Sequence, residues 1–360
     1  MEYLFGDILE IKNGKNQKAV ENQDGLYPIY GSGGVIGHAD SYICEADTVI
    51  IGRKGSINNP IYVAEPFWNV DTAFGLEAKR DLLLPRYLFY YCKKYNFEKL
   101  NKTVTIPSLT KADLLNIKID LPRIEEQKNI IDNLMKTESI IALRRQELSD
   151  LDELIRARFV EMFGMPGTDT YGWGMVPLGS ACCINPKKGK DSRLESGIEV
   201  SFVPMTAVTE HGEIEVSTIK EYDEVKTGFT YFAENDVLFA KITPCMENGK
   251  GAISKGLHNG IGFGSTEFHV LRPIDGKTDP YWIYTLTAFP QFRADAASNM
   301  TGSAGQRRVP ASFLEKYQVS LPPLLLQQQF ADFVTQVNKS KVMNVILNLI
   351  FTVPIEDEAV

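Results

Sequence analysis

A glycine-rich stretch near the start of the chain is the first candidate for chemistry. Residues 27–37 read YPIYGSGGVIG and contain four glycines, a composition that lets a backbone cradle a phosphate group. The dinucleotide-binding fingerprint needs the spacing G-x-G-x-x-G between a strand and a helix. Gly31 and Gly33 fit, but Ile36 occupies the third glycine position and no helical pattern follows. The spacing and the context therefore argue against a nucleotide-cofactor loop.

The other reactive residue types form no catalytic or metal-binding pattern. The five cysteines include no C-x-x-C pair, and the four histidines are scattered without an H-E-x-x-H motif. An odd number of cysteines is typical of reduced thiols in a cytosol. Asn59-Pro-Ile-Tyr62 is similar to the Asn-Pro-Pro-Tyr motif with which amino-methyltransferases hold a flipped adenine, but its third residue is Ile and no S-adenosylmethionine loop precedes it. These patterns argue against a histidine-based metal site and against methyltransferase chemistry in this chain.

Charge and hydropathy narrow the class of protein. Taken over the whole chain, the net charge of −8 argues weakly against a nucleic-acid partner. The acidic excess is concentrated in residues 125–163 and in the tail 356–358, so the remainder is close to neutral and can still present a local basic face. No apolar run reaches the ~18 residues of a membrane span, and the first residues do not resemble a signal peptide. We therefore expect a cytoplasmic protein.

A change in sequence texture divides the chain. Residues 1–122 hold short strand-like runs at 47–52, 61–63 and 117–121, with a helix beginning at Pro85. From Glu125 to Phe163 there is no glycine or proline, and apolar residues recur at helical spacing. This pattern predicts a helix about 58 Å long at 1.5 Å per residue. Because its apolar stripe outruns any small domain, the helix needs a helical partner, as in a coiled coil.

The organisation of the first half then recurs in the second. Five segments return in the same order: 3–6 (YLFG) as 176–179 (VPLG), 45–50 (EADTVI) as 234–239 (ENDVLF), 72–74 (TAF) as 266–268 (TEF), the helix at Pro85 as 280–284 (PYWIY), and 119–127 (IDLPRIEEQ) as 319–327 (VSLPPLLLQ). A second glycine-free helix follows from about Leu324 to Phe351.

This duplication predicts an α+β fold. Two similar globular domains are separated by two long helices, packed as an antiparallel coiled coil with pseudo-two-fold symmetry. The predicted boundaries are 1–122 and 165–322 for the domains, 123–164 and 323–352 for the helices, and 353–360 for an acidic tail. The second helix is nearly all apolar over 342–351, so we expect it to be truncated or altered. Such an exposed apolar end predicts self-association or reduced solubility of the isolated chain.

Taken together, these residues resemble the DNA-specificity (S) subunit of type I restriction-modification systems. The resemblance spans nearly the whole chain and is carried by YPIYGSGG, ADTVIIGRKGS, IPSLTKADLLNIKIDLPRIEEQKNI, ENDVLFAKI and LEKYQVSLPPLLLQQQF. It implies that each globular domain is a target recognition domain reading one half of a bipartite site in double-stranded DNA. It implies that the helices set the spacing, which we expect to be roughly one half to one helical turn of DNA.

The same resemblance implies partner proteins. Two modification (methyltransferase) subunits would dock on the helices, and restriction (endonuclease/translocase) subunits would join them. S-adenosylmethionine, ATP and Mg would belong to those partners and not to this chain, which would have no catalytic residues and no metal or cofactor of its own. Two alternatives stay open: an orphan sequence-specific DNA binder without functional enzyme partners, and a scaffold that binds no DNA.

With DNA as the implied ligand, the candidate contacts are loop residues. Glycine lets the backbone approach a phosphate or a base edge, arginine can read guanine, and lysine can neutralise phosphate. The alternative for each is a purely structural role in a tight turn or a solvated hairpin tip. The candidates in the first half are Gly31, Ser32, Gly33, Arg53, Lys54, Lys102, Thr103 and Thr105. Those in the second half are Lys241, Thr243, Lys250, Ser303, Gln306, Arg307 and Arg308. We expect the segment 302–308 to be the strongest site.

Overall fold

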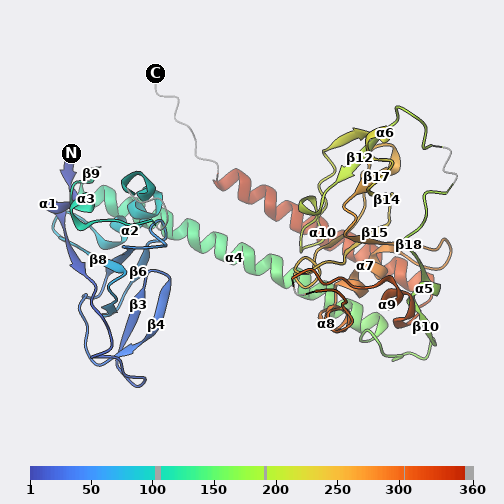
Figure 1. Ribbon diagram of the computed structural model, residues 1–360, viewed down its shortest axis with the longest axis horizontal. Coiled ribbons are helices and arrows are strands. Elements are labelled where there is room, and N and C mark those ends of the chain that lie inside the picture. Colours follow the sequence, from blue (N-terminus) through green and yellow to red (C-terminus); the bar gives the residue numbers. More distant parts are fainter. Residues whose placement is uncertain (102–106, 190–192, 304, 353–360) are drawn as a thin grey trace. The chain divides into compact units, whose positions relative to one another are not determined.

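Two compact units make up the chain. The computed structural model describes residues 1–101, 107–189, 193–303 and 305–352, and beyond Lys341 it describes only the helical backbone (Figure 1). The first unit is Met1–Ala142 and the second is Leu143–Val360. The long helix α4 (Ile124–Phe163) belongs in part to each.

The first unit combines short helices with mostly antiparallel strands. Its strands are β1 (Glu2–Leu4), β2 (Leu9–Asn13), β3 (Tyr27–Gly31), β4 (Gly34–Ala39), β5 (Thr48–Gly52), β6 (Ile61–Val63), β7 (Trp68–Asn69), β8 (Ala73–Ala78) and β9 (Lys118–Asp120). Its helices, besides α4, are α1 (Phe5–Ile8), α2 (Pro85–Lys94), the 3-10 helix η1 (Phe97–Leu100) and α3 (Lys111–Leu115). The sheets have the orders β2-β8-β5-β6, β4-β3-β7 and β1-β9.

The second unit repeats this plan. Its strands are β10 (Met175–Pro177), β11 (Cys182–Ile184), β12 (Glu199–Val203), β13 (Ile219–Glu221), β14 (Thr230–Ala233), β15 (Val237–Ala240), β16 (Gly251–Ile253), β17 (Ile261–Gly264), β18 (Phe268–Pro273) and β19 (Gln318–Ser320). Its helices, besides α4, are α5 (Leu178–Ala181), η2 (Met205–Ala207), α6 (Tyr222–Val225), η3 (His258–Gly260), α7 (Pro280–Ala288), α8 (Pro290–Ser298), α9 (Ala311–Lys316) and α10 (Leu324–Thr352). The sheets β11-β18-β15-β16, β13-β12-β17-β14 and β10-β19 match those of the first unit, with β14 added.

The main core of each unit lies between one four-stranded sheet and the short helices. That sheet is β2-β8-β5-β6 in the first unit and β11-β18-β15-β16 in the second. In the first unit Phe5 of α1 and Leu88 of α2 are fully buried against Leu76 of β8. In the second unit Leu178 of α5 and Ile283 of α7 are fully buried in the equivalent core. Both α2 and α7 begin with a proline, whose fixed φ and missing N–H suit the first helical turn.

The register of the repeat differs by one residue from the alignment expected from sequence. The last residue of β5, Gly52, faces Ala73 of β8, while the last residue of β15, Ala240, faces Phe268 of β18. Counting back from these residues makes Asp47 equivalent to Asn235, and both have a positive φ, 62° and 67°. The expected matches of segment 45–50 with 234–239 and of segment 72–74 with 266–268 are therefore each wrong by one position. Asp and Asn both tolerate the left-handed conformation, so the backbone, not side-chain identity, sets the register.

A buried glutamine explains the L-P-x-x-x-x-Q motif that occurs twice. The side-chain oxygen of Gln127 accepts a hydrogen bond from the Leu84 N–H, and its amide donates to the carbonyls of Leu82 and Pro122. The amide of Gln327 repeats all three bonds, accepting from Asp279 and donating to Lys277 and Pro322. Both glutamines are completely buried. Each one joins the start of a long helix to the residue just before α2 or α7.

Within the second unit, α10 packs against the C-terminal part of α4. The Phe330 ring lies 5.4 Å from Phe163 and 5.5 Å from Phe159, centroid to centroid. Further along, Lys341 of α10 forms an ion pair with Asp152 of α4. Residue numbers rise along one helix as they fall along the other, so the two segments run antiparallel. Helix α4 has 40 residues and the described part of α10 has 29.

None of the described helices is both long enough and apolar enough to cross a membrane.

Candidate functional site

In the first unit, the loop after β5 is fixed by the segment that precedes α3. The Leu109 N–H donates to the Arg53 carbonyl at 2.9 Å, and the Gly55 N–H donates to the Pro107 carbonyl at 3.1 Å. These bonds form a bridge between Lys54 and the residue after Pro107. Two segments that are about fifty residues apart in the sequence therefore form one surface.

The second unit has the same pair of backbone hydrogen bonds after β15. The Val309 N–H donates to the Lys241 carbonyl at 2.9 Å, and the Thr243 N–H donates to the Arg307 carbonyl at 3.0 Å. A bridge joins Ile242 to Arg308 at the position of the bridge in the first unit. The two units thus hold loops of different sequence on the same backbone scaffold, which we call the loop scaffold.

The glycine-rich stretch forms a hairpin tip that lies beside the loop scaffold of the first unit. Strands β3 and β4 are joined through Ser32 and Gly33, and Gly31 pairs with Gly34. The Ser32 Cβ lies only 3.2 Å from the position that a Cβ would take on Gly52, the residue before Arg53. The predicted turn and the predicted basic loop are therefore neighbours. A Cβ on Gly33 would meet nothing within 4 Å among the described residues, so the tip faces open space.

The side chains of the first loop scaffold are exposed. Arg53 is exposed, with its guanidinium 5.9 Å from the Phe74 ring centroid and an Nη1–H donated to the Asp71 carbonyl at 3.4 Å. Lys54 is exposed, and no side-chain partner is recorded for it among the described residues. Both can meet an anionic ligand without giving up a strong internal bond. The candidates Lys102, Thr103 and Thr105 lie outside the described residues.

The second loop scaffold carries a charged pair that the first does not have. The Arg308 guanidinium donates two hydrogen bonds to the Glu267 carboxylate, from Nε at 2.9 Å and from Nη2 at 2.8 Å. These bonds are the main reason that the pKa of Glu267 is lowered and that of Arg308 raised. Half-buried Lys241 lies nearby, and burial lowers the pKa of its ammonium, an effect that Glu267 opposes.

The remaining candidates of the second unit divide into exposed residues and internally bonded ones. Ser303 and Gln306 are exposed and lie in one turn, in which the Gln306 N–H donates to the Ser303 carbonyl at 3.0 Å. The other three donate to internal acceptors: Arg307 to the Ala297 carbonyl, Thr243 to the Glu247 carboxylate, and Lys250 to the Met205 carbonyl. The bond from the Lys250 Nζ to the Met205 carbonyl is the longest of the three, at 3.4 Å.

The sequence reasoning missed three residues at these surfaces. Glu267 was noticed only as part of a repeated triplet, and its pairing with Arg308 spans 41 positions. Val35 and Ile36 follow the glycine tip and are 53% and 56% exposed. A bulge between Ile29 and Tyr30 breaks the alternation of β4, so two consecutive apolar side chains both remain exposed. A pair of adjacent apolar residues directly after the glycine tip was the available signal.

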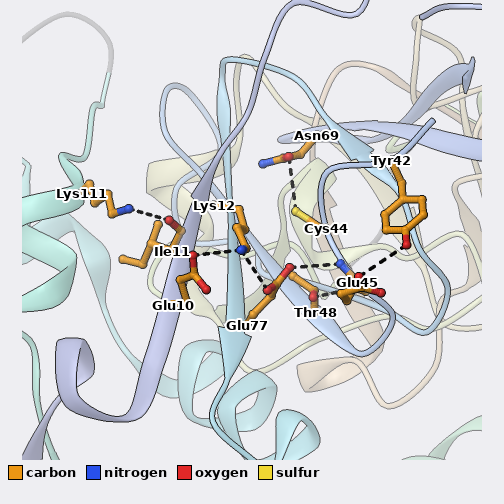
Figure 2. Close-up of polar contacts among 10 residues, drawn as sticks. All are labelled: Glu10, Ile11, Lys12, Tyr42, Cys44, Glu45, Thr48, Asn69, Glu77 and Lys111. Carbon is orange, nitrogen blue, oxygen red and sulfur yellow. Dashed lines mark hydrogen bonds and ion pairs between the residues drawn. The ribbon is translucent and has the colours of Figure 1, made fainter.

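A second polar cluster in the first unit has a structural explanation (Figure 2). Glu10 of β2 lies directly opposite Glu77 of β8, an arrangement of like charges that destabilises a sheet. Lys12 lies between them, with its Nζ 2.9 Å from Glu10 and 3.6 Å from Glu77. The Lys12 hydrogen bond lowers the pKa of Glu10, and the same bond raises the pKa of Lys12. Lys12 offsets one of the two negative charges, and its ammonium is held by both carboxylates, so it is not free for a ligand.

The residues of the loop scaffolds are suited to recognising a ligand. Among the described residues no group of three or more His, Cys, Asp and Glu side chains is placed to hold a metal. A cavity of about 670 Å3 in the second unit is lined by parts of α4, α7, α8 and α10, and it contains none of the candidate residues that the structure describes. Exposed glycines, backbone N–H groups, arginines and a lysine form surfaces suited to phosphates and base edges.

Comparison with known proteins identifies the family. The model of the type I restriction modification DNA specificity domain matches residues 1–153 and again residues 171–350. The specificity subunit of the type I restriction enzyme EcoEI of Escherichia coli is 43% identical over 153 residues, which is 42% of this chain and 25% of that protein. The EcoAI specificity subunit of the same organism is 40% identical over 166 residues, 46% of this chain and 28% of that protein. The matched segment therefore spans about a quarter of each relative's length.

Solved structures show the same fold. The S subunit of a type I restriction-modification system from M. genitalium has a TM-score of 0.52 at 14% identity, with 97% of this chain and 93% of that one covered. A chain from a study of complex assembly and conformational transition of the type I R-M system has a TM-score of 0.56 at 17% identity, with the same coverage. The predicted α+β fold with two similar globular domains and long helices is confirmed, and the chain belongs to the family of type I restriction modification DNA specificity domains.

Proposed function

We propose that this chain is the sequence-specific DNA-binding subunit of a type I restriction-modification complex. Each unit reads one half of a bipartite site in double-stranded DNA. The long helices set the distance between the half-sites and dock the methyltransferase subunits, which the restriction subunits join. The chain itself contributes recognition, while S-adenosylmethionine, ATP and Mg are bound by its partners.

The observation that carries this proposal is the pair of loop scaffolds. Equivalent backbone hydrogen bonds hold both, yet the side chains that they present differ: Lys54 occupies the position of Ile242, and Ser108 that of Arg308. A constant backbone with variable side chains suits two readers that face two different short sequences. A duplication kept only for stability would give no reason for charge to change at these positions.

Mapping of adenine methylation tests the proposal. DNA from cells that carry this chain together with a methyltransferase subunit of its own system is compared with DNA from cells that carry the methyltransferase alone. A split motif that appears only in the presence of this chain is the expected result, and it reveals both half-sites. If the methylation pattern is the same in both cells, this chain does not direct the methyltransferase.

Variants of the two scaffolds sharpen the test. Arg53→Gln should change the methylated sequence in one half of the split motif only, because Arg53 belongs to the first unit. Arg308→Lys should change the other half only. Lys94→Gln is a matched control, since Lys94 is exposed on α2 and no side-chain partner is recorded for it among the described residues. A change of both halves by either single variant would contradict the assignment of one half-site to each unit.

One observation favours the orphan DNA binder as the alternative. Residues 342–351 of α10 are nearly all apolar, so the second docking surface for a methyltransferase differs from the first. The alternative predicts that the purified chain selects a split motif from random duplex DNA although cells show no new methylation. Selection together with methylation excludes the alternative.

A further inference from the structure

Glu267 and Arg308 form a two-bond ion pair at the edge of the second loop scaffold. The side chain of Arg308 is 42% exposed and that of Glu267 is 25% exposed, so the pair lies at the surface. The two bonds use Nε and Nη2, which form one side of the planar guanidinium group. A third donor, on Nη1, bonds to the Gln306 carbonyl at 3.2 Å.

This arrangement leaves part of the guanidinium group free. Arginine has five N–H donors. Two meet Glu267 and one meets Gln306, so one donor on Nη1 and one on Nη2 have no partner recorded among the described residues. Nη1 and Nη2 together form the end of the guanidinium that can bond the O6 and N7 atoms of guanine at the same time.

The backbone on both sides of the pair is fixed. The N–H of Arg308 donates to the Thr301 carbonyl at 2.8 Å, and the Thr301 N–H donates back at 2.9 Å. On the other side, the Lys241 N–H donates to the Glu267 carbonyl at 2.9 Å. With the main chain and the side chain both held, Arg308 loses little conformational freedom when it binds a ligand.

The first unit shows that the scaffold does not need this ion pair. The residue equivalent to Glu267 is Thr72, because the Arg53 N–H donates to the Thr72 carbonyl as that of Lys241 does to Glu267. The residue equivalent to Arg308 is Ser108, which takes its place in the bridge to Lys54. The same backbone forms with two uncharged residues, so the charged pair has another use.

We propose that Glu267 is a positioning residue that holds Arg308 in the orientation needed to contact a base in the half-site read by the second unit. This inference rests on the proposed function. A carboxylate close to DNA repels phosphate and lowers affinity for every sequence. We therefore expect the fixed arginine to provide a gain in sequence selectivity that offsets this loss of affinity.

The experiment is selection of bound sequences from a pool of randomised duplex DNA by the full chain in complex with its methyltransferase subunits. The wild-type complex should enrich two short half-sites. Glu267→Gln should lower the preference at one position of one half-site by about tenfold, within the range for a bidentate arginine contact. The other half-site, read by the first unit, should be unchanged and serves as the internal control.

Binding of the same variant to a single random-sequence duplex supplies the second readout. Because one negative charge is removed near phosphate, this affinity should rise or stay constant while selectivity falls. A purely structural role would lower both. Glu315→Gln is the matched control for charge, since Glu315 is exposed on α9 and no side-chain partner is recorded for it among the described residues.

Arg308→Lys tests the same idea without touching Glu267. Lysine keeps the charge but not the fork, so selectivity at the same position should fall while the salt dependence of binding to random duplex stays the same. Unchanged selectivity in both variants, or an equal loss at every position, overturns the inference and leaves the proposed function intact. A wild-type complex that enriches no half-site overturns the proposed function and this inference with it.

Discussion

Replacing Gln327 with alanine should destabilise the second unit by removing the link between α10 and α7. The side chain is completely buried and makes three hydrogen bonds to backbone groups, at 2.9, 3.1 and 2.8 Å. Without it, the Asp279 N–H and two carbonyls lose their partner in a site closed to solvent. At about 1 kcal/mol for each bond, the free energy of unfolding should fall by about 3 kcal/mol. For a unit of this size that corresponds to a drop in Tm of about 6–12 °C.

Differential scanning calorimetry of the full chain is the assay. The two compact units should unfold in separate transitions, so Gln327→Ala should lower only the transition of the second unit. Gln127→Ala, which removes the equivalent three bonds, should lower only that of the first. Gln327→Met keeps most of the side-chain volume without the hydrogen bonds, and so separates the loss of bonds from the creation of a cavity.

The matched control is Gln328→Ala, the same substitution at the next residue of the same helix. Gln328 is exposed, and no side-chain hydrogen bond is recorded for it among the described residues. Its effect should stay within about 0.5 kcal/mol, as for an ordinary surface substitution. If Gln327→Ala and Gln328→Ala change the Tm equally, the buried glutamine does not anchor the helix and the reasoning fails.

Three further substitutions have defined expectations. Lys12→Met removes the cation between the opposed carboxylates of Glu10 and Glu77 and should destabilise the first unit by about 1 kcal/mol. In that variant stability should decrease as pH rises from about 4 to 7, because the carboxylates repel once ionised; denaturant unfolding that gains stability over this range contradicts it. Burial lowers the pKa of His269, so the second unit should lose stability as pH falls below about 6.5, where only the unfolded state takes up the proton. His269→Phe, which introduces the residue found at the equivalent position Phe74, should remove this dependence, and a slope that persists would assign it to another group. Gly52→Ala would place a Cβ 2.5 Å from a backbone oxygen of the next loop and should cost about 1–3 kcal/mol and displace that loop; equal Tm and equal DNA binding would refute this.

The sequence by itself determined the architecture, because the relevant signals are local or repeated. A glycine-free run with helical spacing is sufficient to predict α4, and a proline at the first turn is sufficient to place α2 and α7. The duplicated order of motifs predicted two similar domains. The glutamine of the L-P-x-x-x-x-Q motif was visible from its recurrence, although its role in joining two helices was not.

Only the tertiary structure decided which residues meet. The register of the repeat shifted by one residue because main-chain hydrogen bonds of β5 and β15 set it, and sequence similarity had favoured Asp236 over Asn235 as the match for Asp47. The close approach of Ser32 to Gly52 and the ion pair of Glu267 with Arg308 both join residues that are far apart in the sequence. Such contacts depend on how strands pair across a fold, and a local pattern carries no information about that pairing.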